Sequence, residues 1–144
     1  MVRVRRATPG EVIDLRHAVL RAGLPRETAI FPGDDAAGTV HVVAVEGDQI
    51  VGCATIVASA WNAEKSWQLR GMAVRPSLQR TGVGGMMLKQ LQQIARESSA
   101  DVRLMWCNAR SLAVGFYERH GWTVASDEFV IETAGPHFKM TLKL

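Results

Sequence analysis

A glycine-rich turn at residues 79–85 carries the most informative chemical signal in this sequence. It is Gln79-Arg80-Thr81-Gly82-Val83-Gly84-Gly85, and it follows an apolar run and leads into a helical pattern. Such a turn gathers backbone N–H groups that have no partner in the helix, and the helix dipole adds partial positive charge at the same place. The turn therefore predicts a binding site for a phosphate-bearing ligand.

Two nucleotide-binding motifs with glycine-rich turns are excluded by the neighbouring residues. A P-loop needs Lys and then Ser or Thr after its last glycine, whereas Gly85 is followed by two methionines. A dinucleotide-binding turn needs a third glycine where this chain has Met87. A helix start that binds no ligand stays open as the alternative.

Two separate blocks of residues resemble the GCN5-related N-acetyltransferase (GNAT) family. The first is the pattern Gln-x-x-Gly-x-Gly, from Gln79 to Gly84, preceded by the run at 69–76. The second block consists of Asn108, Ala113, Phe116, Tyr117, Glu118, Gly121 and Trp122. Together they span residues 69–122, somewhat more than a third of the chain, and two spaced blocks are more specific than one.

The resemblance implies that the chain binds acetyl-CoA as its cosubstrate. Main-chain groups on the strand before the turn would pair with the pantetheine arm, and the N–H groups of the turn would hold the pyrophosphate. Asn108 would hydrogen-bond the pantetheine amide, although an ordinary turn asparagine is an equal alternative. The implied cofactor-binding residues are Met72, Ala73, Val74, Gln79, Arg80, Thr81, Gly82, Val83, Gly84, Gly85, Asn108 and Phe116.

The implied chemistry is direct attack of an amine on the acetyl thioester. A backbone N–H near Met72 would stabilise the developing oxyanion. Tyr117, the only tyrosine, would be the catalytic acid that protonates the departing thiolate. The alternative for Tyr117 is a helix residue that packs against Phe116 and has no chemical role.

The catalytic base is the weakest part of the resemblance. Many relatives carry a glutamate where this chain has Gln68, and an amide cannot accept the proton. We expect His137, beside Gly135-Pro136, to be the base, because its ordinary pKa suits the task. An exposed hairpin histidine without a role is the alternative. Other candidates are Glu132, Glu64 and His41.

The acceptor is not fixed by the sequence, and both small-molecule and protein amines stay open. Asp34 and Asp35, in the long loop after the first helix, could hold a cationic amine or simply form a turn. Arg70 could instead bind an acidic acceptor. Trp61 and Trp67 could form the wall of a pocket or pack in the interior.

The order of elements predicts the α/β (α+β) acyl-CoA N-acyltransferase fold that the motifs resemble. This fold has a mixed central sheet of six to seven strands, splayed at its middle and flanked by three to four helices. A capping box from Thr8 to Glu11 begins the first helix. The expected strands are 2–5, 40–45, 50–58, 67–74, 102–107, 122–131 and 138–144, with loops at 22–38 and 60–66 and helices after Glu11, after the glycine turn and at 111–119.

Length and composition favour a small cytoplasmic enzyme. The 144 residues predict one domain over 1–144, and a net charge of +3 with scattered basic residues argues against nucleic-acid binding. No apolar stretch is long enough for a membrane span. Cys53 and Cys107 lie in apolar runs and are expected to be reduced. Exposed edge strands would allow a homodimer.

The function predicted is therefore acetyl transfer from acetyl-CoA to a primary amine. Because of Gln68, a non-catalytic acyl-CoA-binding sensor or scaffold module is the alternative. A protein-interaction domain without a ligand is a third possibility to be tested.

Overall fold

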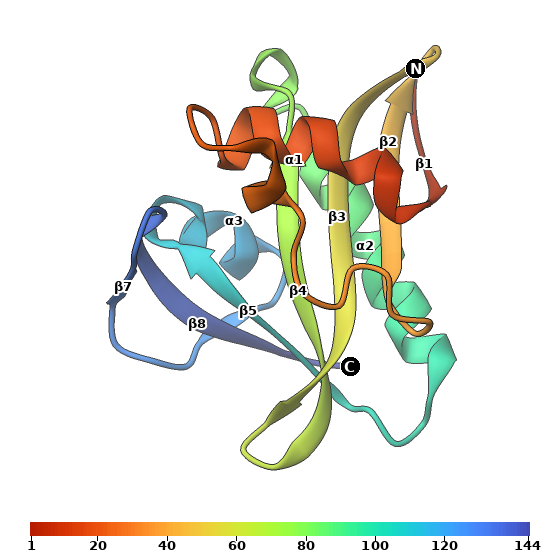
Figure 1. Cartoon of the computed structure of the whole chain (residues 1–144). Helices are drawn as coiled ribbons and strands as arrows, with labels where there is room; N and C mark the ends of the chain where they lie inside the picture. The colour runs from red at the N-terminus through yellow and green to blue at the C-terminus, as the bar shows by residue number, and fades with distance from the viewer. The chain divides into compact units, whose positions relative to one another are not determined.

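The structure is a computed structural model that describes residues Met1–Leu144, and its elements follow the expected order (Figure 1). The strands are β1 (Val2–Ala7), β2 (Val40–Glu46), β3 (Gln49–Trp61), β4 (Glu64–Val74), β5 (Leu104–Arg110), β6 (Thr123–Val124), β7 (Phe129–Ile131) and β8 (Gly135–Lys143). The α-helices are α1 (Ile13–Leu20), α2 (Val83–Ser98) and α3 (Val114–Arg119). Short 3-10 helices are η1 (Pro9–Val12), η2 (Arg26–Ala29), η3 (Pro76–Leu78) and η4 (Ser111–Ala113).

The strands form the mixed sheet that was predicted. They pair in the order β1-β2-β3-β4-β5-β8-β6, and β7 also pairs with β8. β4 and β5 are parallel, with Trp67–Leu69 opposite Met105–Cys107, as the intervening helix predicted. The sheet has eight strands because the expected strand 122–131 is divided into β6 and β7, which pair separately with β8.

The chain divides into two compact units, which we describe one at a time. The first unit contains Met1–Val57 and Arg70–Ile94, and the second contains Ala58–Leu69 and Ala95–Leu144. The expectation of a single domain over 1–144 remains a proposal.

In the first unit, β2 and β3 are covered on both faces. On one face Val12 and Ile13 pack with Val43 and Cys53, and α1 lies in front of these strands in Figure 1. On the other face Gly52 leaves room for α2, since a Cβ there would lie 2.8 Å from the Cε of Met87. Two buried faces explain why these strands are almost continuously apolar.

The start of the first helix follows the predicted capping box. The Thr8 N–H donates to Oε1 of Glu11 at 2.9 Å, and the Arg5 guanidinium lies 2.7 Å from Oε2 of Glu11. These hydrogen bonds lower the pKa of Glu11 to about 2, and the one from Arg5 makes the largest contribution. The box begins η1, which leads directly into α1. The long loop that follows contains the 3-10 helix η2, which its glycines and prolines did not predict.

In the second unit, β5 alternates between two faces. Met105, Cys107 and Ala109 are buried on one face, together with Met140 on β8 and Tyr117 on α3. The expected loop 60–66 is wrong, because β3 and β4 are joined by a turn at Asn62-Ala63, with φ values of 48° and 69°. Positive φ at both positions is the geometry of a tight hairpin, and the absence of glycine concealed it in the sequence.

Candidate active site

The glycine-rich turn lies between η3 and α2 in the first unit. Arg80 and Gly82 have positive φ values of 66° and 93°, which turn the chain sharply into the helix. The Gln79 side chain donates to the carbonyl of Val74 at 3.1 Å and ties the turn to β4. At the start of α2, the Met86 N–H donates to the carbonyl of Gly82 at 3.1 Å. The earlier N–H groups are therefore available to a ligand.

The end of β4 carries the main-chain groups expected to pair with the pantetheine arm. Ala73 is buried, whereas Met72 and Val74 are half-buried, so their backbone lies near the surface of this unit. Gly71, just before them, has φ +66°. A Cβ at Gly71 would lie 2.8 Å from Nε of Arg16, so a larger residue would displace that guanidinium.

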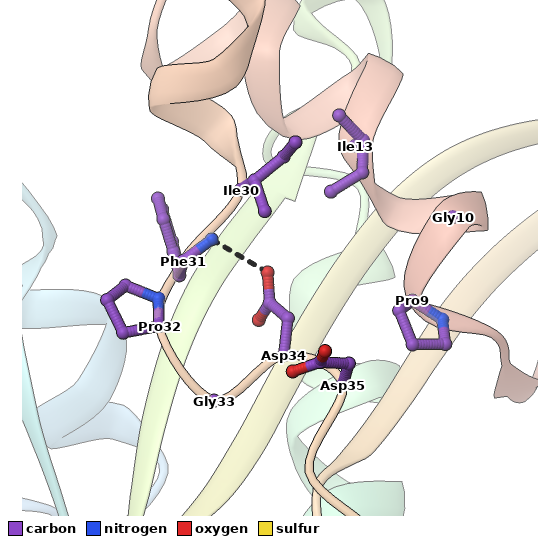
Figure 2. Close-up of a pocket in the computed structure, with 9 residues that line it drawn as sticks. All are labelled: Pro9, Gly10, Ile13, Ile30, Phe31, Pro32, Gly33, Asp34 and Asp35. Carbon is purple, nitrogen blue, oxygen red and sulfur yellow. Dashed lines mark hydrogen bonds between the residues drawn. The ribbon is translucent and has the colours of Figure 1, made fainter.

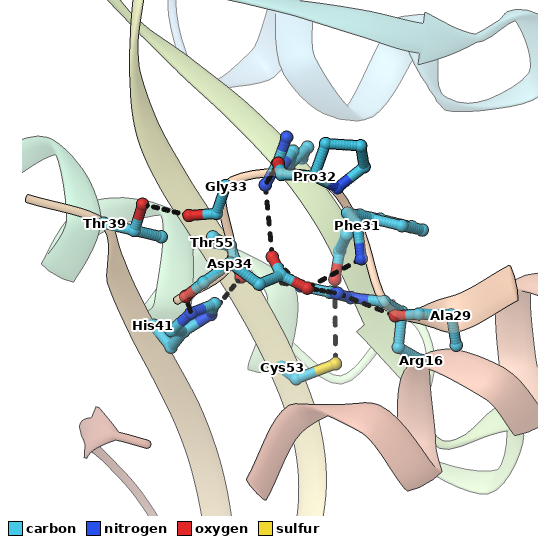
Figure 3. Close-up of polar contacts among 12 residues, drawn as sticks. Arg16, Ala29, Phe31, Pro32, Gly33, Asp34, Thr39, His41, Cys53 and Thr55 are labelled. Carbon is cyan, nitrogen blue, oxygen red and sulfur yellow. Dashed lines mark hydrogen bonds and ion pairs between the residues drawn. The ribbon is translucent and has the colours of Figure 1, made fainter. Parts of the chain in front are cut away.

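A buried polar cluster in the first unit was missed by the sequence analysis. We call it the Arg16 cluster, and it consists of Arg16, Asp34, His41, Thr55 and Arg70. Figure 3 labels the first four of these residues. The Arg16 side chain is 0% exposed, and its Nη1 lies 2.6 Å from Oδ2 of Asp34. Its Nη2 donates to Oγ1 of Thr55 at 3.0 Å. A signal existed, since Arg16 lies four residues after Val12 and three before Val19, within the apolar stripe of the helix.

The loop after η2 is held onto this cluster. Nη1 of Arg16 donates to the carbonyl of Ala29 at 2.8 Å, and its guanidinium lies 4.1 Å from the ring centre of Phe31. The Phe31 N–H donates to Asp34 at 2.8 Å (Figure 2). Asp34 is thus an interior ion-pair partner, so it is not free to hold a cationic amine.

The Asp34 carboxyl stays ionised in spite of its burial. Burial raises the pKa of Asp34, but the hydrogen bonds from Arg16 and Phe31 and the charges of Arg16 and Arg70 outweigh it, so the pKa lies below its ordinary value.

His41 is part of the same cluster and is unsuited to be the base. Its Nε2 donates to the carbonyl of Asp34 at 2.8 Å, and its Nδ1 lies 2.7 Å from Oγ1 of Thr55. Both ring nitrogens are occupied by these partners, so neither is free to take a proton from a substrate.

A pocket of about 520 Å³ lies beside this loop (Figure 2). Its apolar lining comes from Pro9, Ile13, Ile30, Phe31 and Pro32. Asp35 is the exposed carboxylate among the residues that line it.

In the second unit, Tyr117 is buried, with 6% of its surface exposed. Its ring makes edge contacts with Phe116 and Trp122, at centroid distances of 5.1 Å and 5.4 Å. Burial raises the pKa of Tyr117 above its ordinary value, and Cys107 makes a smaller contribution in the same direction. The phenol therefore remains protonated at neutral pH, which an acid requires.

His137 is buried, with 4% exposed, and so differs from the exposed hairpin histidine of the alternative. Its Nδ1 lies 2.7 Å from the carbonyl of Gly135, which can only accept, so the ring proton is on Nδ1. Nε2 then carries the lone pair that a base needs. The ring lies beside Phe129, at 6.1 Å between centroids.

The neighbours of His137 on this face are polar and aromatic. Asn108 is paired with Lys139 across the strands, and Lys139 Nζ lies 3.5 Å from Oδ1 of Asn108. Nζ also lies 4.7 Å from the ring centre of Trp106, which contacts Trp61. Trp61 thus packs on the sheet surface, whereas Trp67 is buried.

Gln68 lies on β4 opposite Trp106. Glu64 and Glu132 are both exposed.

The two cysteines are free and buried, as expected. Burial raises the pKa of Cys53 to about 11, with Arg16 acting in the opposite direction. Burial raises the pKa of Cys107 to about 12. No group of three His, Cys, Asp or Glu side chains suited to a metal occurs, and none of the helices has the length and apolarity needed to cross a membrane.

A glycine-rich turn at the start of a long helix, in a mixed sheet of this order, is the arrangement expected of the acyl-CoA-dependent N-acetyltransferases that the motifs resemble. The comparison with known families agrees, because residues 37–124 match the Acetyltransferase (GNAT) domain. The chain belongs to the GNAT family.

Relatives and solved structures extend this result over the whole chain. The uncharacterized N-acetyltransferase YitI of Bacillus subtilis (strain 168) is 25% identical over 143 residues, covering 97% of this chain and 95% of YitI. The uncharacterized N-acetyltransferase YjcF of the same organism is 31% identical over 101 residues, covering 69% of this chain and 67% of YjcF.

Among solved structures, Escherichia coli ElaA has a TM-score of 0.79 at 20% identity, covering 98% of this chain and 99% of ElaA. An aminoglycoside 6'-N-acetyltransferase complexed with coenzyme A has a TM-score of 0.76 at 13% identity, covering 98% of this chain and 96% of that chain. These likenesses confirm the fold. The fold thus includes a member that binds coenzyme A.

Proposed function

We propose that this N-acetyltransferase moves an acetyl group from acetyl-CoA to a primary amine by direct attack. The observation that carries the proposal is the turn at 79–85, whose N–H groups lie at the start of the 16-residue helix α2. These groups and the helix dipole suit the pyrophosphate of the cosubstrate. The backbone of Met72, Ala73 and Val74 would pair with its pantetheine arm, and Asn108 and Phe116 would complete the cofactor-binding set.

The reaction forms a C–N bond and breaks the C–S bond of the thioester. The neutral amine attacks the carbonyl carbon, and the Met72 N–H stabilises the resulting oxyanion. His137 Nε2 takes the proton from the attacking nitrogen. Tyr117 gives its proton to the thiolate as the C–S bond breaks, and the two protons balance over the cycle.

The raised pKa of Tyr117 and the tautomer of His137 both support these assignments. A phenol with a raised pKa is protonated when the thiolate leaves, as an acid must be; the same shift makes the phenol a weaker acid towards a thiolate, so it supports only the protonation state. Nε2 of His137 is unprotonated in the neutral ring.

The test is release of CoA thiol from acetyl-CoA across a panel of primary amines, with wild type and Tyr117→Phe. We expect turnover with at least one amine and a fall in kcat of about 10²- to 10⁴-fold in Tyr117→Phe. Phe116→Leu, on the same helix, is the control for a packing effect.

The alternative is a non-catalytic acyl-CoA-binding sensor or scaffold, motivated by Gln68. Calorimetric binding of CoA, with no turnover for any amine and no effect of Tyr117→Phe, would support this alternative. Absence of any heat with CoA would support a protein-interaction domain.

We also propose the cytoplasm as the compartment, because two free buried cysteines suit reducing conditions. A small-molecule or protein amine is the expected partner, without nucleic acid or membrane, and a homodimer remains a proposal for sedimentation analysis.

A further inference from the structure

We propose that Arg70 binds a carboxylate on the acceptor, so that the acceptors of this enzyme are amines that also carry a carboxylate, such as amino acids. This inference rests on the proposed function and names its substrate class. It is carried by the Arg16 cluster and by the one guanidinium of that cluster that reaches the surface.

The Arg16 cluster contains more positive than negative charge. The Asp34 carboxylate is shared by two guanidiniums, with Arg16 Nη1 at 2.6 Å from Oδ2 and Arg70 Nη2 at 3.2 Å from Oδ1. Two guanidiniums and one carboxylate leave one positive charge without a counter-ion, and an anionic ligand would neutralise it.

Arg16 cannot be the receptor, because its side chain is 0% exposed. Its two terminal nitrogens already donate to Ala29, Asp34 and Thr55. The surplus charge is therefore available to a ligand only at Arg70.

Arg70 is held in place on one side and open on the other. Its Nη2 donates to the carbonyl of Pro32 and to Asp34. Its Nε is buried without a hydrogen-bond partner, and 18% of the side chain is exposed. Nη1 makes no hydrogen bond. A guanidinium fixed in this way presents the unused N–H donors of Nη1, together with its charge, to a carboxylate at the surface.

The position of Arg70 along β4 suits an acceptor of small size. It lies two residues before Met72, which corresponds to about 7 Å along a strand. A small amine with a carboxylate would therefore be anchored close to the peptide group proposed to hold the oxyanion.

A purely cationic acceptor is disfavoured by the same contacts. Asp34 is already bound to two guanidiniums, and three guanidiniums, those of Arg16, Arg21 and Arg70, lie within 4.1–5.7 Å of the Phe31 ring centre. Asp35, beside the pocket, is the remaining carboxylate that could bind a cation. If the enzyme preferred amines without a carboxylate, Asp35 would be the residue indicated.

The experiment compares each amino acid with its amide, which removes the carboxylate and little else. The amide has the more readily deprotonated amine, so amine chemistry alone would favour it. We expect wild type to prefer the acids in kcat/KM by about 10- to 100-fold, mainly through KM.

Arg70→Gln should remove this preference and leave the amides within about twofold of wild type. Arg70→Lys should restore part of this preference, because a lysine keeps the positive charge but lacks the planar guanidinium. Asp34 keeps Arg16 and the Phe31 N–H in both variants, so the fold should be retained. Arg6→Gln, an exposed arginine on β1, is the matched control and should retain the preference.

Two results would overturn the inference. If wild type acetylates amides or plain amines as well as it does acids, the carboxylate site is wrong while the proposed function stands. If no amine supports CoA release, the proposed function is wrong, and calorimetry with the same amino acids decides this inference. Binding by wild type that is lost in Arg70→Gln supports the carboxylate site, and no binding by wild type overturns it.

Discussion

The buried ion pair between Arg16 and Asp34 leads to a quantitative prediction about stability. Asp34→Asn removes the carboxylate and leaves the guanidiniums of Arg16 and Arg70 facing each other. Arg16→Met removes the donor to Ala29 and Thr55, but Asp34 keeps Arg70 at 3.2 Å and the Phe31 N–H at 2.8 Å. We therefore expect Asp34→Asn to be the more damaging of the two.

The size of the effect follows from burial. Removing one partner of a buried pair costs about 3–5 kcal/mol of the free energy of unfolding, because the other charge is left uncompensated. Arg16 and Asp34 side chains are 0% and 5% exposed. We expect Asp34→Asn near the upper end of that range and Arg16→Met near the lower end.

The chain offers a matched control with the same residue types and nearly the same distance. Arg26 and Asp14 lie 2.7 Å apart, but their side chains are 55% and 88% exposed. An exposed pair contributes about 0–1 kcal/mol, so Arg26→Met should change the free energy of unfolding by less than about 1 kcal/mol.

Urea unfolding followed by tryptophan fluorescence measures these differences. With a slope of about 2 kcal/mol per molar urea, the buried variants should lower the unfolding midpoint by about 1.5–2.5 M and the exposed control by less than about 0.5 M. The double variant Arg16→Met/Asp34→Asn should cost less than the sum of the single variants, because it removes both charges. Equal midpoints for Asp34→Asn and the exposed control would refute the reasoning.

Three further predictions concern the same interior. Gly71→Ala should destabilise the protein by about 1–3 kcal/mol, since a Cβ would lie 2.8 Å from a buried guanidinium nitrogen. Gly10→Ala should not destabilise the protein, because a Cβ there would meet no atom within 4 Å. Equal unfolding midpoints for the Gly71→Ala and Gly10→Ala variants would contradict the prediction. The pKa values of Cys53 and Cys107, raised to about 11 and about 12, predict that a disulfide reagent labels neither thiol in the folded protein and both in guanidinium. Rapid native labelling of either would contradict this. The lowered pKa of Asp34 means that its stabilisation is present above the unfolded value of about 3.9 and is lost as pH falls. The stability difference between wild type and Asp34→Asn should therefore be constant above about pH 5 and shrink as the pH falls below about 4, and a constant difference down to acid pH would count against it.

The parts of the site that depend on local sequence were predictable. The turn at 79–85 was expected from its glycines, and Gly82 has the positive φ that such a residue permits. The capping box at Thr8 and Glu11 was also expected, since its contacts span three residues. Motifs of this kind form their geometry within a few residues, so one sequence is sufficient to identify them.

The Arg16 cluster could not be predicted in the same way. Its members lie on α1, the loop after η2, β2, β3 and β4, so their contacts depend on how the chain folds back on itself. An arginine within an apolar stripe indicates that something unusual occurs, but not which carboxylate meets it. Asp34 was expected either to hold a cationic amine or to form a turn after Pro32-Gly33, and neither expectation included an ion pair with Arg16.

The register of β5 and β8 adds a relation between the two proposed catalytic residues that neither motif contained. Cys107 pairs with Met140 on the buried face, and Cys107 is among the groups that raise the pKa of Tyr117, so Tyr117 lies on that face. His137 is three residues before Met140, so its side chain points to the opposite face. The contact of His137 with Phe129 and that of Lys139 with Trp106 agree with this orientation. Within this unit the proposed base and acid thus lie on opposite faces of one strand pair. The attacking nitrogen and the departing sulfur are bonded to one carbon, so both roles hold only if that carbon lies at the end of the strand pair, beyond the pairing of Arg110 with His137, where side chains of both faces can reach it.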